Sequence, residues 1–112
     1  MKNIVWIGNN LQVDTLMAKL LRRNGYMVQI ATTQNSVTFH PDLIILDCDL
    51  TPYEGFQKYD GWIQSWLPAK ILWISSNEDD EIKALEFGAD EFIKKPYHVE
   101  VLLARIGKLC TR

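Results

Sequence analysis

The sequence predicts an α/β domain built on a doubly wound sheet of five parallel strands. Five short segments are almost wholly apolar, as expected of strands buried on both faces; they are residues 4–7, 26–31, 43–47, 71–74 and 92–94. Helical periodicity or turn residues fill the intervals between them. Such alternation requires right-handed crossovers, with helices on both faces of the sheet. The 112 residues suit one such domain and leave too little chain for a second.

The first helix directly follows the first strand. Gly8 ends that strand, and Asn9 or Asn10 can cap a helix that starts at Leu11. Apolar positions then repeat at helical spacing until a stop at Asn24-Gly25. The predicted buried face of this helix consists of Val13, Leu16, Met17, Leu20 and Leu21.

The other intervals differ in helical content. Residues 32–40 show no amphipathic period, which predicts a loop with at most a turn or two of helix, so the second helix of the domain is shortened or missing. Residues 51–55 are predicted to form a turn because of their Pro and Gly. Ser76 or Asn77 is placed to cap the helix that follows the fourth strand. Further helices are predicted over residues 57–67, 78–87 and 99–109.

Composition and charge exclude several classes of function. A formal net charge of -2 lacks the cluster of Lys and Arg that nucleic acid binding requires. Cys48 and Cys110 lie far apart without a CxxC or His partner, which excludes a disulfide scaffold and a zinc site. The N-terminal segment is neither a signal peptide nor a membrane span. We therefore expect a cytoplasmic protein that contacts no membrane and binds no DNA through this domain.

Polar residues stand where the predicted strands end. Asp47 closes the third strand, Ser75 the fourth, and Lys95 follows the fifth. Parallel sheets place their sites at the carboxyl ends of the strands, so these side chains should converge. A carboxylate, a hydroxyl and an ammonium facing one crevice form a phosphoryl-acceptor site, in which the carboxylate attacks and the other two groups bind the phosphoryl oxygens.

Several stretches match a known family pattern: PDLIILD at 41–47, Gly55-Phe56, residues 71–75, LEFGADEFIKKPY at 85–97 and LLARI at 102–106. The last two are highly specific in combination. With them, the chain resembles the receiver domains of bacterial two-component response regulators over essentially its whole length. The resemblance implies a flavodoxin-like sheet of strand order 2-1-3-4-5. It also implies a signalling domain and not an enzyme.

The resemblance assigns roles to four residues. It implies that Asp47 is the phosphoacceptor, Ser75 the switch hydroxyl, Lys95 the phosphate-binding lysine and Phe92 the rotating switch aromatic. The family usually holds the peptide bond between Lys95 and Pro96 in the cis form, which would aim the ammonium at Asp47.

The LLARI stretch looks most like receivers that are attached to a winged-helix DNA-binding domain. Receivers of that kind dimerise symmetrically on the face formed by the family's helix 4, strand 5 and helix 5. Glu91 and Arg105 fall where they place an intersubunit salt bridge. The resemblance thus implies a homodimer, a sensor histidine kinase as partner, and DNA contact through a C-terminal domain. Residues 1–112 would be the receiver part of a longer regulator.

The chain departs from the family after the first strand. Where the family carries two adjacent acidic residues, this sequence has Gly8 and Asn9. Magnesium is a hard cation that takes oxygen ligands, and usually carboxylates, in a near-octahedral set. The candidates left are Asp47, Asn9 and Asp49. We therefore expect Mg²⁺ binding to be weak or absent, and no other cofactor.

These observations predict an atypical receiver that regulates transcription through dimerisation and does so independently of phosphorylation, or with only weak phosphorylation of Asp47. One alternative is a conventional phosphoacceptor receiver with weak Mg²⁺ affinity. A second, from a different class, is a stand-alone flavodoxin-like adaptor that binds a ligand or another protein.

Overall fold

The predicted strands form one parallel sheet in the order β2-β1-β3-β4-β5, as the sequence indicated. In the computed structural model, which describes residues 1–111, β3 is the central strand and all of its residues are buried. This burial on both faces explains its continuous apolar sequence. The strands are β1 (Asn3–Gly8), β2 (Met27–Ile30), β3 (Leu43–Asp47), β4 (Lys70–Ser75) and β5 (Glu91–Lys94).

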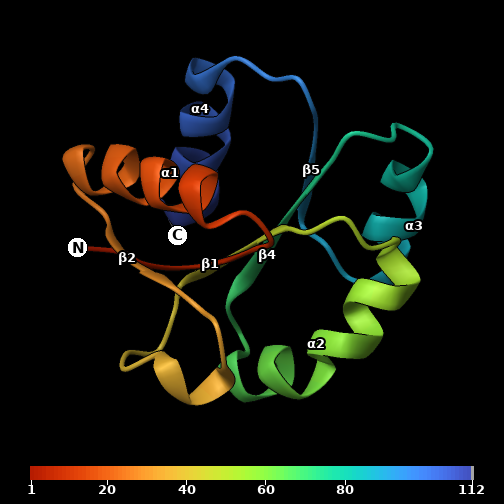
Figure 1. The fold of residues 1–112 in the computed structure, drawn as a ribbon, viewed down its shortest axis with the longest axis horizontal. Helices are drawn as coiled ribbons and strands as arrows, with labels where there is room; N and C mark the ends of the chain where they lie inside the picture. The colour runs from red at the N-terminus through yellow and green to blue at the C-terminus, as the bar shows by residue number, and fades with distance from the viewer. Residues whose placement is uncertain (112) are drawn as a thin grey trace.

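Helices cover both faces of the sheet (Figure 1). One face packs against α1 (Leu11–Arg23) and α4 (Val99–Cys110), in a core that includes Trp6 and Ile45. The other face packs against α2 (Pro52–Trp66) and α3 (Asp80–Phe87), in a core that includes Trp73. Successive residues of a strand point to opposite faces. The sheet therefore separates two hydrophobic cores.

The connection between β2 and β3 contains one turn of 3₁₀ helix, η1 (Gln34–Ser36). It occupies the place of the second helix, which confirms the prediction that this helix is shortened or missing. Ser36 Oγ donates a hydrogen bond to the carbonyl of Thr33 at 2.6 Å, which fixes the turn locally. No helix within residues 1–111 has the length and apolar character needed to cross a membrane.

Two predicted helix starts were wrong. Helix α2 begins at Pro52 and not at residue 57, because Thr51 and Glu54 form a capping box: Thr51 Oγ1 accepts from the Glu54 amide at 3.2 Å, and Glu54 Oε1 accepts from the Thr51 amide at 3.1 Å. Pro52 suits the first helical position, where no amide donor is needed. Helix α3 begins at Asp80, two residues later than predicted, since the Asn77 side chain forms a turn by accepting from the Asp79 amide.

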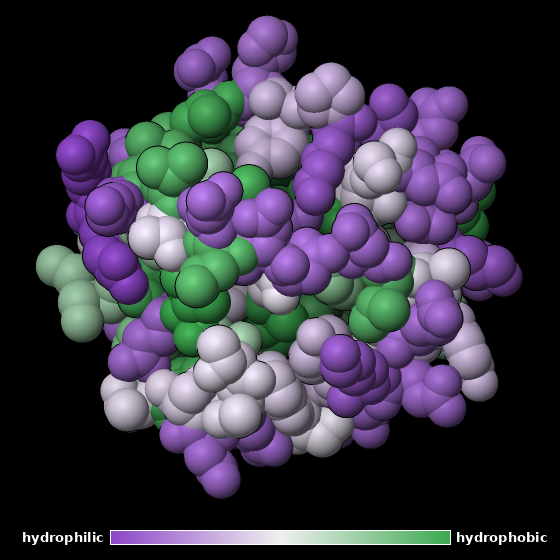
Figure 2. Space-filling view, viewed as in Figure 1, coloured by the Kyte–Doolittle hydropathy of each residue, from purple (hydrophilic) through white to green (hydrophobic). Residues whose placement is uncertain are grey.

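The buried face of α1 also differs from the prediction. The helix begins at Leu11 as predicted, with Asn10 Oδ1 accepting from the Val13 amide at 3.2 Å. Of the predicted residues, Leu21 is buried and Met17 packs against the core, whereas Val13 is 42% and Leu16 66% exposed. The other buried residues of the helix are Asp14 and Ala18. Figure 2 shows hydrophobic side chains on the surface over the region of α1. An acidic residue therefore occupies the buried face, where it needs a polar partner.

Candidate functional site

The sheet brings the predicted site residues to one edge. Gly8 of β1 pairs in register with Asp47 of β3, and Ser75 of β4 pairs with Lys94 of β5. Asp47 and Ser75 are the last residues of their strands, and Lys95 follows β5 directly. The carboxyl ends of β1, β3, β4 and β5 thus surround one crevice, at the edge where open α/β sheets bind their ligands.

Asp47 and Lys95 form a direct ion pair. Lys95 Nζ lies 2.5 Å from Asp47 Oδ1, with the Asp47 side chain 4% and the Lys95 side chain 35% exposed. The peptide bond between Lys95 and Pro96 is cis, as the resemblance implied. A buried carboxylate is costly unless a positive partner compensates it. In this structure the ammonium of Lys95 supplies that compensation.

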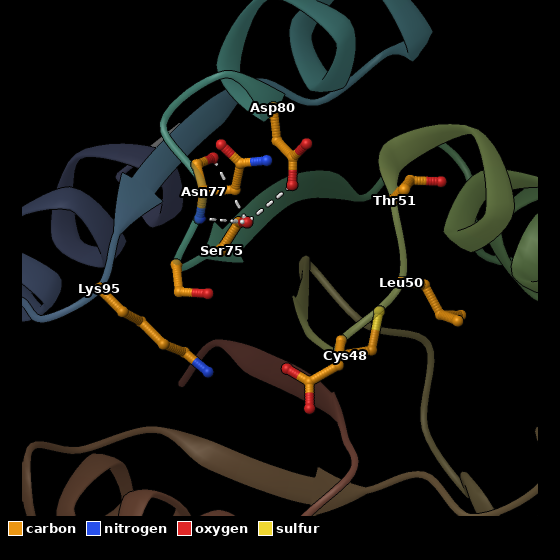
Figure 3. A pocket seen from close by; sticks show the side chains of 9 residues that line it. Cys48, Leu50, Thr51, Ser75, Asn77, Asp80 and Lys95 are labelled. Carbon is orange, nitrogen blue, oxygen red and sulfur yellow. Dashed lines mark hydrogen bonds between the residues drawn. The ribbon is translucent and has the colours of Figure 1, made fainter.

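Ser75 lines the same crevice but faces a different partner. Ser75 and Lys95 both border a cavity of about 260 Å³, together with residues of the loop that follows β3. Figure 3 shows Ser75 turned toward the start of α3, where its Oγ donates to Asp80 Oδ2 at 2.8 Å and accepts from the Asn77 amide at 3.0 Å. The predicted convergence is therefore direct for Asp47 and Lys95, while the Ser75 hydroxyl is held by Asp80.

The two further metal-ligand candidates contact each other. Asn9 Nδ2 donates to Asp49 Oδ2 at 2.6 Å, and both residues are exposed. Within residues 1–111, no group of three or more His, Cys, Asp and Glu side chains is arranged to hold a metal ion.

A carboxylate that the sequence analysis missed lies next to this site. Asp14 of α1 is 4% exposed and accepts a hydrogen bond from Trp6 Nε1 at 2.9 Å. Burial is the main cause that raises the pKa of the Asp14 carboxyl, and the negative charge of Asp47 raises it further, while the bond from Trp6 lowers it. The sequence pattern that could have revealed its burial is the spacing of Asp14, Ala18 and Leu21, which stand at positions i, i+4 and i+7 on one helix face.

The switch and interface candidates lie on or beside β5. Phe92 is 6% exposed and packs in the core on the α2 and α3 side of the sheet. Glu91 and Arg105 pair within the chain, with Arg105 Nη1 donating to Glu91 Oε1 at 2.7 Å. The charges that were predicted to bridge two subunits thus satisfy each other inside one protomer.

Cys48, next to Asp47, is buried, and burial raises the pKa of its thiol. It is therefore protonated and a weak nucleophile at neutral pH. A buried cysteine of this kind behaves as a small core residue.

The family model of the response regulator receiver domain matches residues 4–107. The chain is 31% identical over 119 aligned positions to the transcriptional regulatory protein YvcP of Bacillus subtilis, covering 100% of this chain and 50% of YvcP. It is 35% identical over 81 positions to the sensory transduction protein BceR of Bacillus subtilis, covering 70% of this chain and 35% of BceR. The chain thus spans half or less of these relatives.

A solved structure shows the same architecture. The N-terminal domain of the nisin resistance regulator NsrR, a lantibiotic response regulator, superposes with a TM-score of 0.79 at 28% identity, with 97% of each chain covered. The sheet and the helices on both of its faces are therefore features that this chain has in common with a solved response-regulator domain.

Proposed function

The chain belongs to the response regulator receiver domain family, and from this premise we propose that it is an atypical receiver whose signalling does not depend on metal-assisted phosphorylation of Asp47. Receiver domains of response regulators act in two-component signalling and are not classical enzymes. The observation that carries the proposal is the direct pair between Lys95 Nζ and Asp47 Oδ1. The ammonium of Lys95 thus places a positive charge directly at the phosphoacceptor position.

Electrostatics support this proposal. A phosphoryl group brings negative charge to a carboxylate, and a divalent ion normally offsets the repulsion. Gly8 and Asn9 contribute no carboxylate to hold that ion, and the amide of Asn9 is bound to Asp49. Lys95 would then be the one cation facing both Asp47 and an incoming phosphoryl group. We expect phosphorylation of Asp47 to be slow or absent, with Mg²⁺ binding weak or absent.

The output of the domain is proposed from its relatives. Several of them are named as transcriptional regulatory proteins, and this chain covers half of YvcP and 34–39% of GraR, BceR and KdpE. We propose that it regulates transcription with DNA contacted through a separate C-terminal domain, and that its partner is a sensor histidine kinase. The dimer would form on α3, β5 and α4, which correspond to the family's helix 4, strand 5 and helix 5 because the second helix is missing here.

Phosphorylation is the decisive test. The chain is incubated with acetyl phosphate, or with beryllofluoride as a mimic, in the presence of Mg²⁺, and then analysed by intact mass and by size-exclusion chromatography. We expect no phosphoryl adduct and no change in elution volume, as for the Asp47→Asn variant treated in the same way. A stable adduct on wild-type protein together with a change in oligomeric state would refute the proposal.

A titration with Mg²⁺ followed by tryptophan fluorescence tests the alternative of a conventional receiver with weak metal affinity. Saturation of the fluorescence signal at low millimolar Mg²⁺ would favour that alternative.

The interface proposal predicts a response to charge reversal. Glu91 and Arg105 carry opposite charges and form an ion pair within one protomer. In a dimer on this face, each residue would instead pair with its counterpart across the two-fold axis, so that Glu91 of one protomer contacts Arg105 of the other. Glu91→Lys and Arg105→Glu should each weaken self-association about tenfold, and the double swap should restore it. Sedimentation equilibrium measures the dissociation constants. Lys19→Glu, at an exposed position on α1 and outside this face, serves as a control for charge alone. Equal affinities for all variants would exclude this face as the interface.

A further inference from the structure

The carboxylate of Asp14 fills the space next to Gly8. A Cβ atom added to Gly8 would lie 2.1 Å from Asp14 Oδ1 and 2.4 Å from Oδ2, far inside contact distance. Asp14 cannot easily move away, because its Oδ1 accepts from Trp6 Nε1 at 2.9 Å and both residues are buried. Position 8 is therefore restricted to glycine as long as Asp14 keeps its present place.

Asp14 lies on the same side of the sheet as Asp47. Gly8 and Asp47 are register partners on neighbouring strands. Trp6 and Ile45, two residues before each of them, both belong to the core that α1 covers, so positions 8 and 47 face α1 as well. Neighbouring strands are about 4.8 Å apart, which places the Asp14 carboxylate on the order of one strand spacing from the Asp47 strand end. The charges of Asp47 and Lys95 both influence the pKa of Asp14, in agreement with this proximity.

We propose that Asp14 is a positioning residue of the phosphoacceptor site: from helix α1 its carboxylate occupies the space in which a conventional receiver carries the first acidic side chain, and it holds the crevice in the form that pairs Asp47 with Lys95 and not with a metal ion. This inference rests on the proposed function. Glycine at position 8 and aspartate at position 14 are then one coupled replacement, in which an acidic group has moved from the strand end to the helix.

The surroundings of Asp14 explain why it does not act as a metal ligand. One of its oxygens is bound by the indole N–H of Trp6, and the carboxylate as a whole is shielded from solvent. Lys95 faces Asp47 directly, so the one ammonium of the site is already engaged. A side chain restored at position 8 alone would collide with Asp14 before it could reach a metal ion.

The coupling is tested by a double-mutant cycle. Gly8→Ala, which adds only a Cβ, is measured in the wild-type and the Asp14→Ala backgrounds by urea denaturation. We expect Gly8→Ala to raise the unfolding equilibrium constant at least about tenfold more in the presence of Asp14 than in its absence. Gly61→Ala is the matched control, because an added Cβ at this exposed helical glycine has nothing within 4 Å. Its effect should be the same in both backgrounds. Equal effects of Gly8→Ala in both backgrounds would overturn the inference.

The affinity for Mg²⁺ is a second measurement, and it distinguishes a positioning role of Asp14 at the site from a role in packing alone. The variant Gly8→Asp/Asn9→Asp/Asp14→Ala restores the acidic pair and removes the carboxylate that blocks it. It should bind Mg²⁺ at least about tenfold more tightly than Asn9→Asp alone, measured by tryptophan fluorescence. Failure of the triple variant to gain affinity, although folded, would overturn the inference. Saturation of the wild-type chain with Mg²⁺ would refute the proposed function instead, while a retained coupling between positions 8 and 14 would still support the placement of Asp14.

Discussion

Replacing Lys95 with Met is expected to lower the free energy of unfolding by about 2–4 kcal/mol at neutral pH. The Asp47 side chain is 4% exposed, and Lys95 is its one ion-pair partner within residues 1–111. Loss of the ammonium leaves a buried carboxylate without compensation, which typically costs more than the intact pair contributes. We expect a value toward the lower end, since the Lys95 side chain is 35% exposed and water can reach the site.

The neighbouring lysine supplies the control for this measurement. Lys94→Met removes the same charge from an exposed side chain and should change the stability by no more than about 0.5 kcal/mol in urea denaturation. The double variant Lys95→Met/Asp47→Leu, which removes both charges, should recover most of the loss. Equal stabilities of the Lys95→Met and Lys94→Met variants would show that the pair between Asp47 and Lys95 behaves like an exposed one.

The parallel strands and the position of Asp47 could be predicted because they depend on strong local signals, whereas the strand order followed from the family resemblance. The continuous apolar run of β3 followed by an acidic residue admits few other interpretations, and parallel topology then places Asp47 at the site edge. The convergence of Lys95 with Asp47 followed from the places of both residues at the carboxyl ends of parallel strands, and the family resemblance added the cis bond between Lys95 and Pro96.

The face of α1 was harder to predict because two overlapping sets of positions share the helical period. Leu16 and its apolar neighbours form one stripe, whereas Asp14, Ala18 and Leu21 form the stripe that is buried. A count of apolar residues favours the first stripe as the buried face, because the second stripe contains an aspartate, which is rarely buried. The indole N–H of Trp6, which comes from another element, makes burial of Asp14 acceptable. The wrong prediction of the helix face and the failure to identify Asp14 as a site residue thus have the same cause, which is the hydrogen bond from Trp6 to Asp14.

The start of α2 was missed for a similar reason. Pro52 and Gly55 are common turn residues, so residues 51–55 were predicted to form a turn. Here Pro52 is the first helical residue, and Gly55 is buried within the first turns of the helix. The requirement for glycine comes from tertiary packing, because the indole ring of Trp73 on β4 lies directly against this position.

Gly55→Ala is accordingly expected to reverse the usual effect of removing a glycine from a helix. Alanine normally stabilises a helix interior by about 0.5–1 kcal/mol relative to glycine. At Gly55, however, the new Cβ would lie 2.3 Å from Cη2 of Trp73. The indole ring is fully buried and stacks on Phe56, with ring centroids 5.3 Å apart and planes inclined by 11°, so it has no free space to enter. We expect a loss of about 1–3 kcal/mol from overpacking.

Gly61→Ala in the same helix is the matched control, because an added Cβ there meets nothing within 4 Å, and it should stabilise the protein by about 0.5–1 kcal/mol. The opposite signs of two identical substitutions, measured by thermal and urea denaturation, isolate the contribution of Trp73. In a Trp73→Leu background the smaller side chain frees the space, so Gly55→Ala should lose most of its penalty. A stabilising effect of Gly55→Ala in the wild-type chain would contradict the close packing of α2 on β4, and with it the reason why this helix start carries a glycine.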